Sequence, residues 1–354
     1  MKAVNPSKSA TVLIYGLCLC FFAAAFLLSV SVGSISISLD ETLRILVKRV
    51  FGWGTVEGIS ESNITIIEAV RMPRALLAAM VGGALSISGA AMQGLLKNPL
   101  ADGSTLGVSS GGALGAVLFL VSGINLPFVQ ELGLTLTSIL FSFLSLLLIL
   151  GLSYSIDFQL STHTIILTGV IFSMLTGSLT SMLVSLSGDS LKQVVFWSMG
   201  SFSGKGWHHV LIMLPFFIGG SLLLTLFSRE LNAFALGEEQ ARYVGVNTRR
   251  VKLIILILIS LLIGVSVSLS GTIGFVGLVI PHMTRMLVGP NHTRLLPASL
   301  FVGGTFLMLA DLASRTLFSP AEFPIGVVTS FIGGILFIYL FYSRRNRKGG
   351  DEHA

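Results

Sequence analysis

Charged side chains are scarce in this chain of 354 residues: 11% are Asp, Glu, Lys or Arg, while 53% are hydrophobic. Soluble domains carry about 25% charged residues, so the composition excludes a water-soluble fold. The formal net charge of +6 would suit a nucleic-acid partner. Basic residues gathered in the cytoplasmic loops of a membrane protein give the same excess. We therefore expect a membrane protein in contact with lipid and without a nucleic-acid partner.

Cysteine is nearly absent, and an ATP-binding loop is lacking. The two cysteines, Cys18 and Cys20, lie in one apolar run, where they point in different directions on a helix and cannot easily form a disulfide. No metal site and no cofactor follow from them. The sequence also lacks the pattern G-x-x-x-x-G-K-[ST]. We therefore predict no catalytic residue, and any ATP hydrolysis must come from another subunit.

Long uncharged runs predict the membrane spans, because a helix needs about 20 apolar residues to cross the hydrocarbon core. The first run, 9–39, is too long for the apolar region of a signal peptide and is interpreted as a retained span. The further runs are 75–96, 103–130, 132–156, 158–188, 206–228, 253–284, 295–310 and 323–343. Gly271, Gly274 and Pro281 interrupt the run 253–284, which therefore predicts two helices and raises the total to ten spans.

Basic residues in short loops predict the orientation. The tail 344–354 contains Arg344, Arg345, Arg347 and Lys348, so it is expected in the cytoplasm. Ten spans place the N-terminal segment 1–8 on the same side, together with the loop 229–250. Segments 84–89 and 267–271 are similar and fall in the second span of each five-span half. Two such halves would be inverted in the membrane, within one polytopic all-α domain covering 1–354.

Three arginines fall on the opposite side of this predicted topology, where basic residues are not expected. They are Arg71 and Arg74, before the second span, and Arg315, between the ninth and the tenth. They either meet an acidic partner outside the cell or reach lipid headgroups with their long side chains. Charge alone leaves both interpretations open.

Three polar segments interrupt the apolar background. The segment 93–102 contains Pro99 and is either a gate or an ordinary polar turn. The segment 231–246 is either a partner-binding element or a surface loop. In it Gly237 is expected to end one helix, Glu238 and Glu239 suit the first turn of the next, and Ala241 and Gly245 would leave one face smooth. The third segment, 271–282, has glycines that favour close helix packing; His282 near its end is expected to be structural.

These segments carry a family resemblance. The motifs, in chain order, are RMPR (71–74), GGALSISGAAMQ (82–93), NPLA (98–101), LGE (236–238), GFVGLVIPH (274–282), ADLASR (310–315) and EFPIG (322–326). Together they resemble the permease subunits of the FecCD-type ABC importers for iron–siderophore complexes and cobalamin. The resemblance extends over 71–326, nearly the whole chain.

The resemblance implies a type II importer permease with ten spans in the bacterial cytoplasmic membrane. Its partners would be ATP-hydrolysing subunits, an extracytoplasmic substrate-binding protein, and a second permease subunit, identical or related. Residues implied in docking of the binding protein are Arg71, Arg74 and Arg315. Residues implied in coupling to the ATPase are Leu236, Gly237, Glu238, Glu239, Ala241 and Gly245. Residues implied in the gate are Gln93, Asn98, Pro99 and Leu100.

The substrate implied by the resemblance is a ferric siderophore, with haem or cobalamin as alternatives. A secondary transporter driven by an ion gradient is a rival of another class, because inverted halves suit it as well. Such a protein usually needs carboxylates inside the membrane, and the predicted spans contain essentially none, with Asp311 and Glu322 expected at their outer edges. A membrane scaffold or sensor is a further alternative, for which an output domain would be expected.

Overall fold

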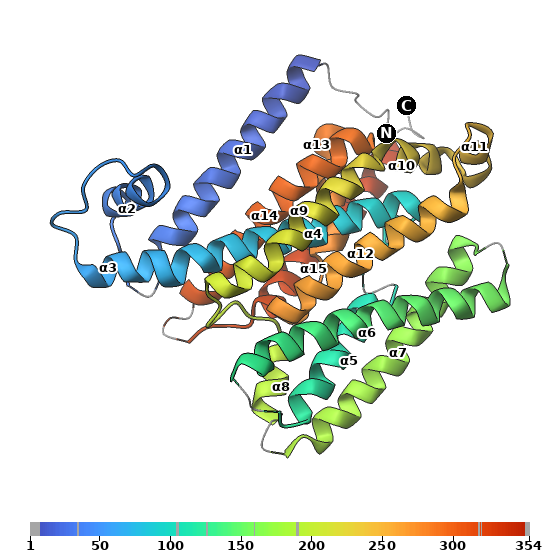
Figure 1. Cartoon of the computed structure of the whole chain (residues 1–354). Helices are drawn as coiled ribbons and strands as arrows, with labels where there is room; N and C mark the ends of the chain where they lie inside the picture. The colour runs from blue at the N-terminus through green and yellow to red at the C-terminus, as the bar shows by residue number, and fades with distance from the viewer. Residues whose placement is uncertain are drawn as a thin grey trace.

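The chain folds into helices. A computed structural model describes residues 8–33, 35–103, 106–124, 127–158, 160–188, 191–317, 319 and 321–350, and these residues contain no strand. The helices are α1 (Lys8–Ser31), α2 (Leu39–Phe51), α3 (Glu61–Thr65), the π-helix η1 (Ile66–Arg71), α4 (Met72–Leu95), α5 (Val108–Val121), α6 (Pro127–Ile156), α7 (Thr162–Leu186), α8 (Leu191–Ser198), α9 (Trp207–Leu226), α10 (Ser228–Leu236), α11 (Glu238–Tyr243), α12 (Thr248–Ser270), α13 (Val276–Val288), α14 (His292–Thr316) and α15 (Ile325–Gly350) (Figure 1). Residues 1–7 of the predicted cytoplasmic N-terminus and 351–354 of the predicted tail lie outside the described residues.

The ten predicted spans are confirmed as helices. Seven helices in the described part of the chain are long and apolar enough to cross a membrane, and the three shorter apolar helices are α5, α13 and the first part of α15. The expected break in the run 253–284 separates α12 from α13. There Gly271 and Phe275 both have a left-handed backbone, with φ of 70° and 68°, which a continuous α-helix does not permit.

The second span begins earlier than predicted. The sequence placed its start at residue 75, after two arginines, but the apolar helix runs without a gap from Glu61 to Leu95. Arg71 and Arg74 are buried within it, with exposed fractions of 4% and 8%. A charged side chain can be buried when it is paired and hydrogen-bonded, and both arginines have partners, described below. Helices α2, α8, α10 and α11 lie between the predicted spans.

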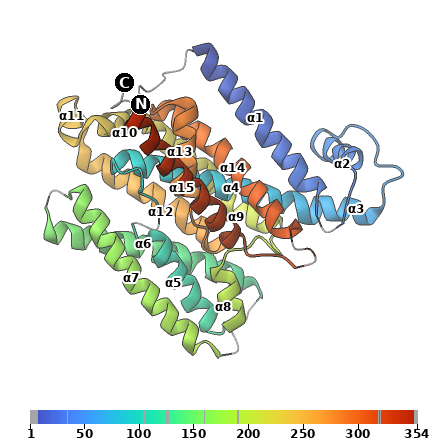
Figure 2. The same ribbon diagram turned by 180° about the vertical axis from the view of Figure 1, so that it is seen from behind.

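The two halves of the chain repeat one packing pattern. Helix α4 packs against α14, and its counterpart α12 packs against α6; likewise α5 packs against α6, and α13 against α14. Because each half has five spans, the second half is inverted relative to the first. Helices α4 and α12 also touch each other and form the buried centre of the molecule (Figures 1 and 2).

Two ends of the helix bundle can be distinguished. Helices α10 and α11 lie at one end, called here the α10 end, and α2 and α3 lie at the other, called the α2 end (Figures 1 and 2). At the α10 end, α10 contacts both α4 and α14. At the α2 end, the helix α2 begins at the cap residue Ser38, whose hydroxyl accepts a hydrogen bond from the amide of Glu41 at 3.2 Å.

Candidate functional site

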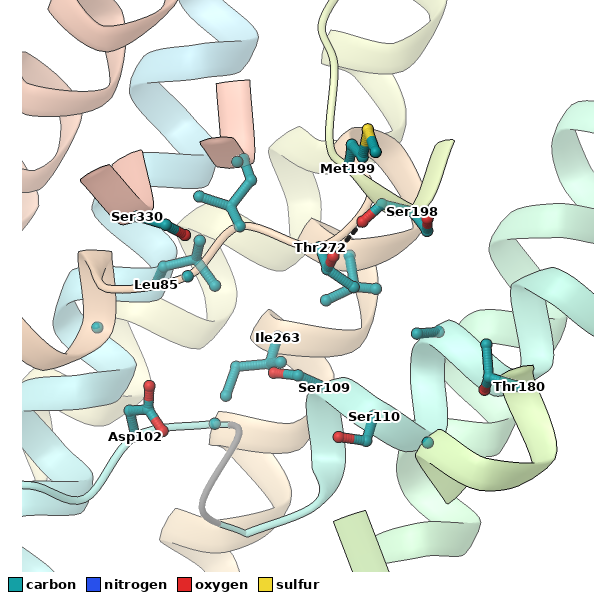
Figure 3. Close-up of a pocket in the computed structure, with 18 of the residues that line it drawn as sticks. Leu85, Asp102, Ser109, Ser110, Thr180, Ser198, Met199, Ile263, Thr272 and Ser330 are labelled. Carbon is teal, nitrogen blue, oxygen red and sulfur yellow. Dashed lines mark hydrogen bonds between the residues drawn. The ribbon is translucent and has the colours of Figure 1, made fainter. Parts of the chain in front are cut away.

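A cavity of about 680 Å³ lies among helices from both halves (Figure 3). Its walls are mostly hydroxyl-bearing, small and aliphatic residues: Leu85, Asp102, Gly103, Ser109, Ser110, Ala113, Gly177, Thr180, Ser198, Met199, Ile263, Val267, Thr272, Ile273, Gly274, Gly277, Gly326, Val327 and Ser330. Among these described lining residues the single charged side chain is that of Asp102. Polar groups in an otherwise apolar hollow are typical of small-molecule sites.

The two breaks in the central helices meet at this cavity. Asp102 and Gly103 come from the segment between α4 and α5, and Thr272 and Gly274 come from the segment between α12 and α13. The Thr272 hydroxyl donates a hydrogen bond to the carbonyl of Ser198 at the end of α8 (Figure 3). Non-helical backbone is tolerated at membrane depth where protein buries it or where it lines a wet cavity. The sequence singled out both segments but gave no sign that they share one cavity.

The four predicted gate residues lie beside the cavity and do not line it. Gln93 is buried, and its Nε2 donates to the carbonyl of Leu278 at 3.0 Å, which ties α4 to α13. The side-chain oxygen of Asn98 accepts from the amide of Leu100 at 2.9 Å, so it shapes a turn in which Pro99 and Leu100 are exposed. Their role in a gate stays a prediction.

The segment predicted to couple to an ATPase has the expected break. Gly237 separates α10 from α11, and its φ of 146° lies in a region that favours glycine. The expected smooth outer face is wrong in one respect, because Ala241 is fully buried and faces the bundle. Helix α11 packs against α10 and α12.

Three large apolar side chains are exposed on this segment. Leu236, Tyr243 and Val244 are exposed to 75%, 88% and 72% of their surface, while Glu239 and Gly245 are exposed beside them. Coupling of this segment to an ATPase stays a prediction. Tyr243 and Val244 were not predicted to lie at this surface, because their exposure depends on which side of α11 faces the bundle.

Glu238 anchors the same segment to two other elements. Its carboxylate accepts from Nζ of Lys252 at 3.0 Å, and the same ammonium group donates to the carbonyl of Leu160 at 3.1 Å. Lys252 has 3% of its side chain exposed, and a buried ammonium group requires such partners. Glu238 therefore connects α11 with α12 and with the turn before α7.

The three predicted docking arginines gather at the α2 end, and each has partners within the chain. Arg71 donates to the carbonyls of Val30 and Ser31. Arg74 donates to both oxygens of Asp311, at 2.9–3.1 Å. Arg315 donates to the Ser29 hydroxyl at 3.0 Å, with its Nε 3.5 Å from Asp311.

The acidic partner that charge bias suggested for Arg74 and Arg315 is thus present in the chain. Asp311 is 1% exposed and lies inside α14, which continues to Thr316. It was expected at the outer edge of a span and lies in the last turns of α14, where paired arginines let the helix bury a carboxylate. Contact of these arginines with a binding protein stays a prediction.

Glu322 completes this cluster from the loop between α14 and α15. Its two oxygens accept from Nη1 of Arg74 at 3.0 and 3.1 Å, and 40% of its side chain is exposed. Partial burial tends to raise the pKa of Glu322, but the hydrogen bonds and charge of Arg74 outweigh burial and lower that pKa below its ordinary 4.5.

The Glu322 ion pair gives a pH-dependent contribution to stability. Because its pKa is lower in the folded protein, the contribution is complete above pH 4.5 and is lost as the pH falls through the lowered value. The difference in thermal midpoint between wild type and Glu322→Gln should therefore stay constant above pH 4.5 and shrink below it. The exposed Glu57→Gln at the same end is the control. A difference that persists unchanged in acid would contradict the pairing.

Comparison with known proteins identifies the family. Residues 21–343 match the FecCD transport family. The chain belongs to this family. It is 44% identical over 330 residues, 93% of each protein, to the uncharacterized ABC transporter permease protein YvrB of Bacillus subtilis. It is 39% identical over 290 residues to the cobalamin import system permease protein BtuC of Halobacterium salinarum, covering 82% of this chain and 77% of that relative.

A solved structure supports the same assignment for this FecCD-family chain. An inward-facing conformation of a metal-chelate type ABC transporter aligns with a TM-score of 0.80 at 34% identity, covering 94% of this chain and 99% of that one. The chain is therefore an ABC importer permease with the type II fold. This decides against an ion-driven secondary transporter. Further relatives, 32–39% identical, are named for hemin, molybdate and Fe(3+)-citrate, so the family leaves the substrate open.

Proposed function

We propose that this permease imports ferric siderophores, together with an ATPase at its cytoplasmic side and a binding protein at its outer side. The observation that carries the proposal is the cavity that both broken segments line, one from each inverted half. Substrate sites at the interface of inverted repeats, formed by broken helices, are a recurring design of transporters.

The size and chemistry of the cavity support an organic chelate as substrate. A volume of about 680 Å³ is in the range of sites for small organic molecules and exceeds what a single oxyanion such as molybdate needs. Hydroxyl groups from Ser109, Ser110, Ser330 and Thr180 offer weak, neutral hydrogen bonds. Weak contacts suit a path that must release its substrate.

The α10 end is proposed to face the cytoplasm. Arg242, Arg249, Arg250 and Lys252 lie in or beside α11 and the start of α12, in accord with the excess of basic residues in cytoplasmic loops. The exposed apolar group of Leu236, Tyr243 and Val244 would then be available to the ATPase. A second permease subunit would close the cavity on the side of α7 and α15, both of which contribute to its lining.

The α2 end is proposed to receive the binding protein. Among the partners of Arg74, Glu322 is the more exposed, with 40% of its side chain accessible compared with 1% for Asp311. Acidic groups of the binding protein would reach Arg74 by taking the place of Glu322. Charge-assisted contacts of this kind favour fast and specific docking.

Uptake in a strain deleted for this gene tests the substrate and the coupling surface together. The strain should lack other importers of the same substrates, and ferric siderophores, hemin, cobalamin and molybdate should be supplied separately. We expect wild type to restore ferric-siderophore uptake and Tyr243→Glu to lower it by about tenfold or more, because a charge replaces an exposed apolar contact. Tyr243→Phe is the matched control, because it keeps the exposed apolar ring at the same position and adds no charge.

Each part of the proposal has its own contrary outcome. If the deletion strain takes up every siderophore normally but loses uptake of hemin, cobalamin or molybdate, the proposed substrate is wrong. The protein would still be an importer, with the lost compound as its substrate. Full activity of Tyr243→Glu would show that the ATPase does not bind the surface of α10 and α11.

A further inference from the structure

A cluster of hydrogen bonds fixes α10 to the beginning of α14. The side-chain oxygen of Asn232, in α10, accepts from the backbone amide of His292 at 2.8 Å and from Nδ1 of the same residue at 2.9 Å. The Asn232 amide group donates to Oδ1 of Asn291 at 2.9 Å. The backbone donor fixes which atom of Asn232 is the oxygen, and that oxygen can only accept, so Nδ1 of His292 carries the ring proton.

The other side of the His292 ring lies against α4. His292 is 3% exposed, and its Nε2 has no hydrogen-bond partner among the described residues. A Cβ atom at Gly94 would overlap Nε2 and would lie 2.9 Å from Cε1. The ring therefore fits against the bare backbone of Gly94, and it touches α10 through one nitrogen and α4 through the opposite edge.

We propose that Asn232, His292 and Gly94 form a link that transmits movement of α10 to α4 and so to the substrate cavity. We call these three residues the α10–α4 link. The inference rests on the proposed function, in which the ATPase acts on α10 and α11. These are positioning residues: they touch neither the substrate nor ATP.

The far side of the link is fixed to two neighbouring helices. Gln93, next to Gly94, donates to the carbonyl of Leu278 in α13 at 3.0 Å. Further along, the backbones of α4 and α14 are in direct contact, because a Cβ on Gly82 would overlap the carbonyl oxygen of Gly303. Helices α4, α13 and α14 are therefore joined by a hydrogen bond and by direct backbone contact. The chain after α4 leads directly to Asp102 in the cavity wall.

A second connection leaves the same cytoplasmic segment and serves as a comparison. Glu238 binds Lys252 at the start of α12, and Lys252 binds the carbonyl of Leu160. The hydrogen bonds of this path end at α12 and at the turn before α7, and they reach α4 only through the packing of α12 against it. Loss of the α10–α4 link should therefore separate ATP hydrolysis from transport, while the segment stays attached to the bundle through Glu238.

The test uses the complete importer, reconstituted with its ATPase and binding protein in proteoliposomes. The measured quantity is substrate transported per ATP hydrolysed. We expect it to fall about tenfold in Gly94→Ala, Asn232→Ala and His292→Asn. His292→Asn places a donor near the Nδ1 position, so the hydrogen bond to Asn232 can form. It removes the ring edge that touches Gly94 and therefore interrupts only the contact with α4. Asn232→Asp keeps the acceptor for His292 but loses the donor to Asn291, so it should recover only part of the ratio.

Gly151→Ala is the matched control for Gly94→Ala, since nothing lies within 4 Å of a Cβ at this helical glycine. All variants are compared as assembled complexes. If Gly94→Ala does not assemble, His292→Asn and Asn232→Ala test the link without it. An unchanged ratio in these two would overturn the link. Absence of ATP-driven transport in the wild-type complex would instead overturn the proposed function.

Discussion

Replacing Asp311 by Asn is expected to destabilise the protein by about 3–5 kcal/mol, as is usual when one partner of a buried ion pair is removed. Asp311 is 1% exposed and lies between the guanidinium groups of Arg74 and Arg315. Its neutralisation leaves Arg315 buried without a carboxylate and Arg74 with Glu322 as its remaining acidic partner. The thermal midpoint of unfolding in detergent measures the effect.

A double-mutant cycle separates the charge effect from loss of shape. Asp311→Asn combined with Arg315→Gln should cost clearly less than the sum of the single changes, because the second substitution removes the cation that the first leaves unpaired. Asp40→Asn is the control, because it breaks the ion pair between Asp40 and Arg44. Their side chains are 70% and 55% exposed, and exposed ion pairs contribute little to stability. Additive effects in the cycle would show that Asp311 and Arg315 do not interact.

The arrangement of the spans could be predicted from the sequence because it depends on local composition. Uncharged runs gave ten helices, and Gly271 and Pro281 indicated two helices in the longest run, as found. The start of α4 was misplaced because Arg74 was taken as the edge of the membrane, whereas it is buried against Asp311. Those two residues are 237 positions apart, and a pairing at that separation is decided by how the helices pack.

The functional site shows the same limit. Gly237 was predicted to end a helix, because a glycine between two short helical segments is a local feature of the sequence. In the structure it separates α10 from α11 with a positive φ. The shared cavity of Asp102 and Thr272 requires both inverted halves to be assembled. The contact between His292 and Gly94 is similar: neither residue carries a signal for the other, and the need for glycine becomes visible only when the ring lies against the helix.

Gly89→Ala is expected to be among the most damaging small substitutions in the chain. A Cβ atom at Gly89 would overlap the carbonyl oxygen of Gly277 and would lie 2.6 Å from its carbonyl carbon and 2.7 Å from its Cα. These atoms are backbone of α13, so no side chain can rotate away and the two helices must separate. Overpacking costs about 1–3 kcal/mol where side chains can yield, and we expect about 3 kcal/mol or more here.

Gly277→Ala, on the opposite side of the same helix contact, tests whether the direction of the added methyl group decides the loss of stability. At Gly277 a Cβ points along α4 and has one close neighbour, the carbonyl oxygen of Leu85 at 3.1 Å, with other atoms at 3.8 Å or beyond. Gly277→Ala should therefore lower the thermal midpoint much less than Gly89→Ala, although both alter the same helix contact. Gly151→Ala, with free space around its Cβ, should stabilise α6 by up to about 1 kcal/mol. Equal losses in Gly89→Ala and Gly277→Ala would mean that α4 and α13 do not approach through the backbone at Gly89, because only that geometry makes the two sides of one contact so unequal.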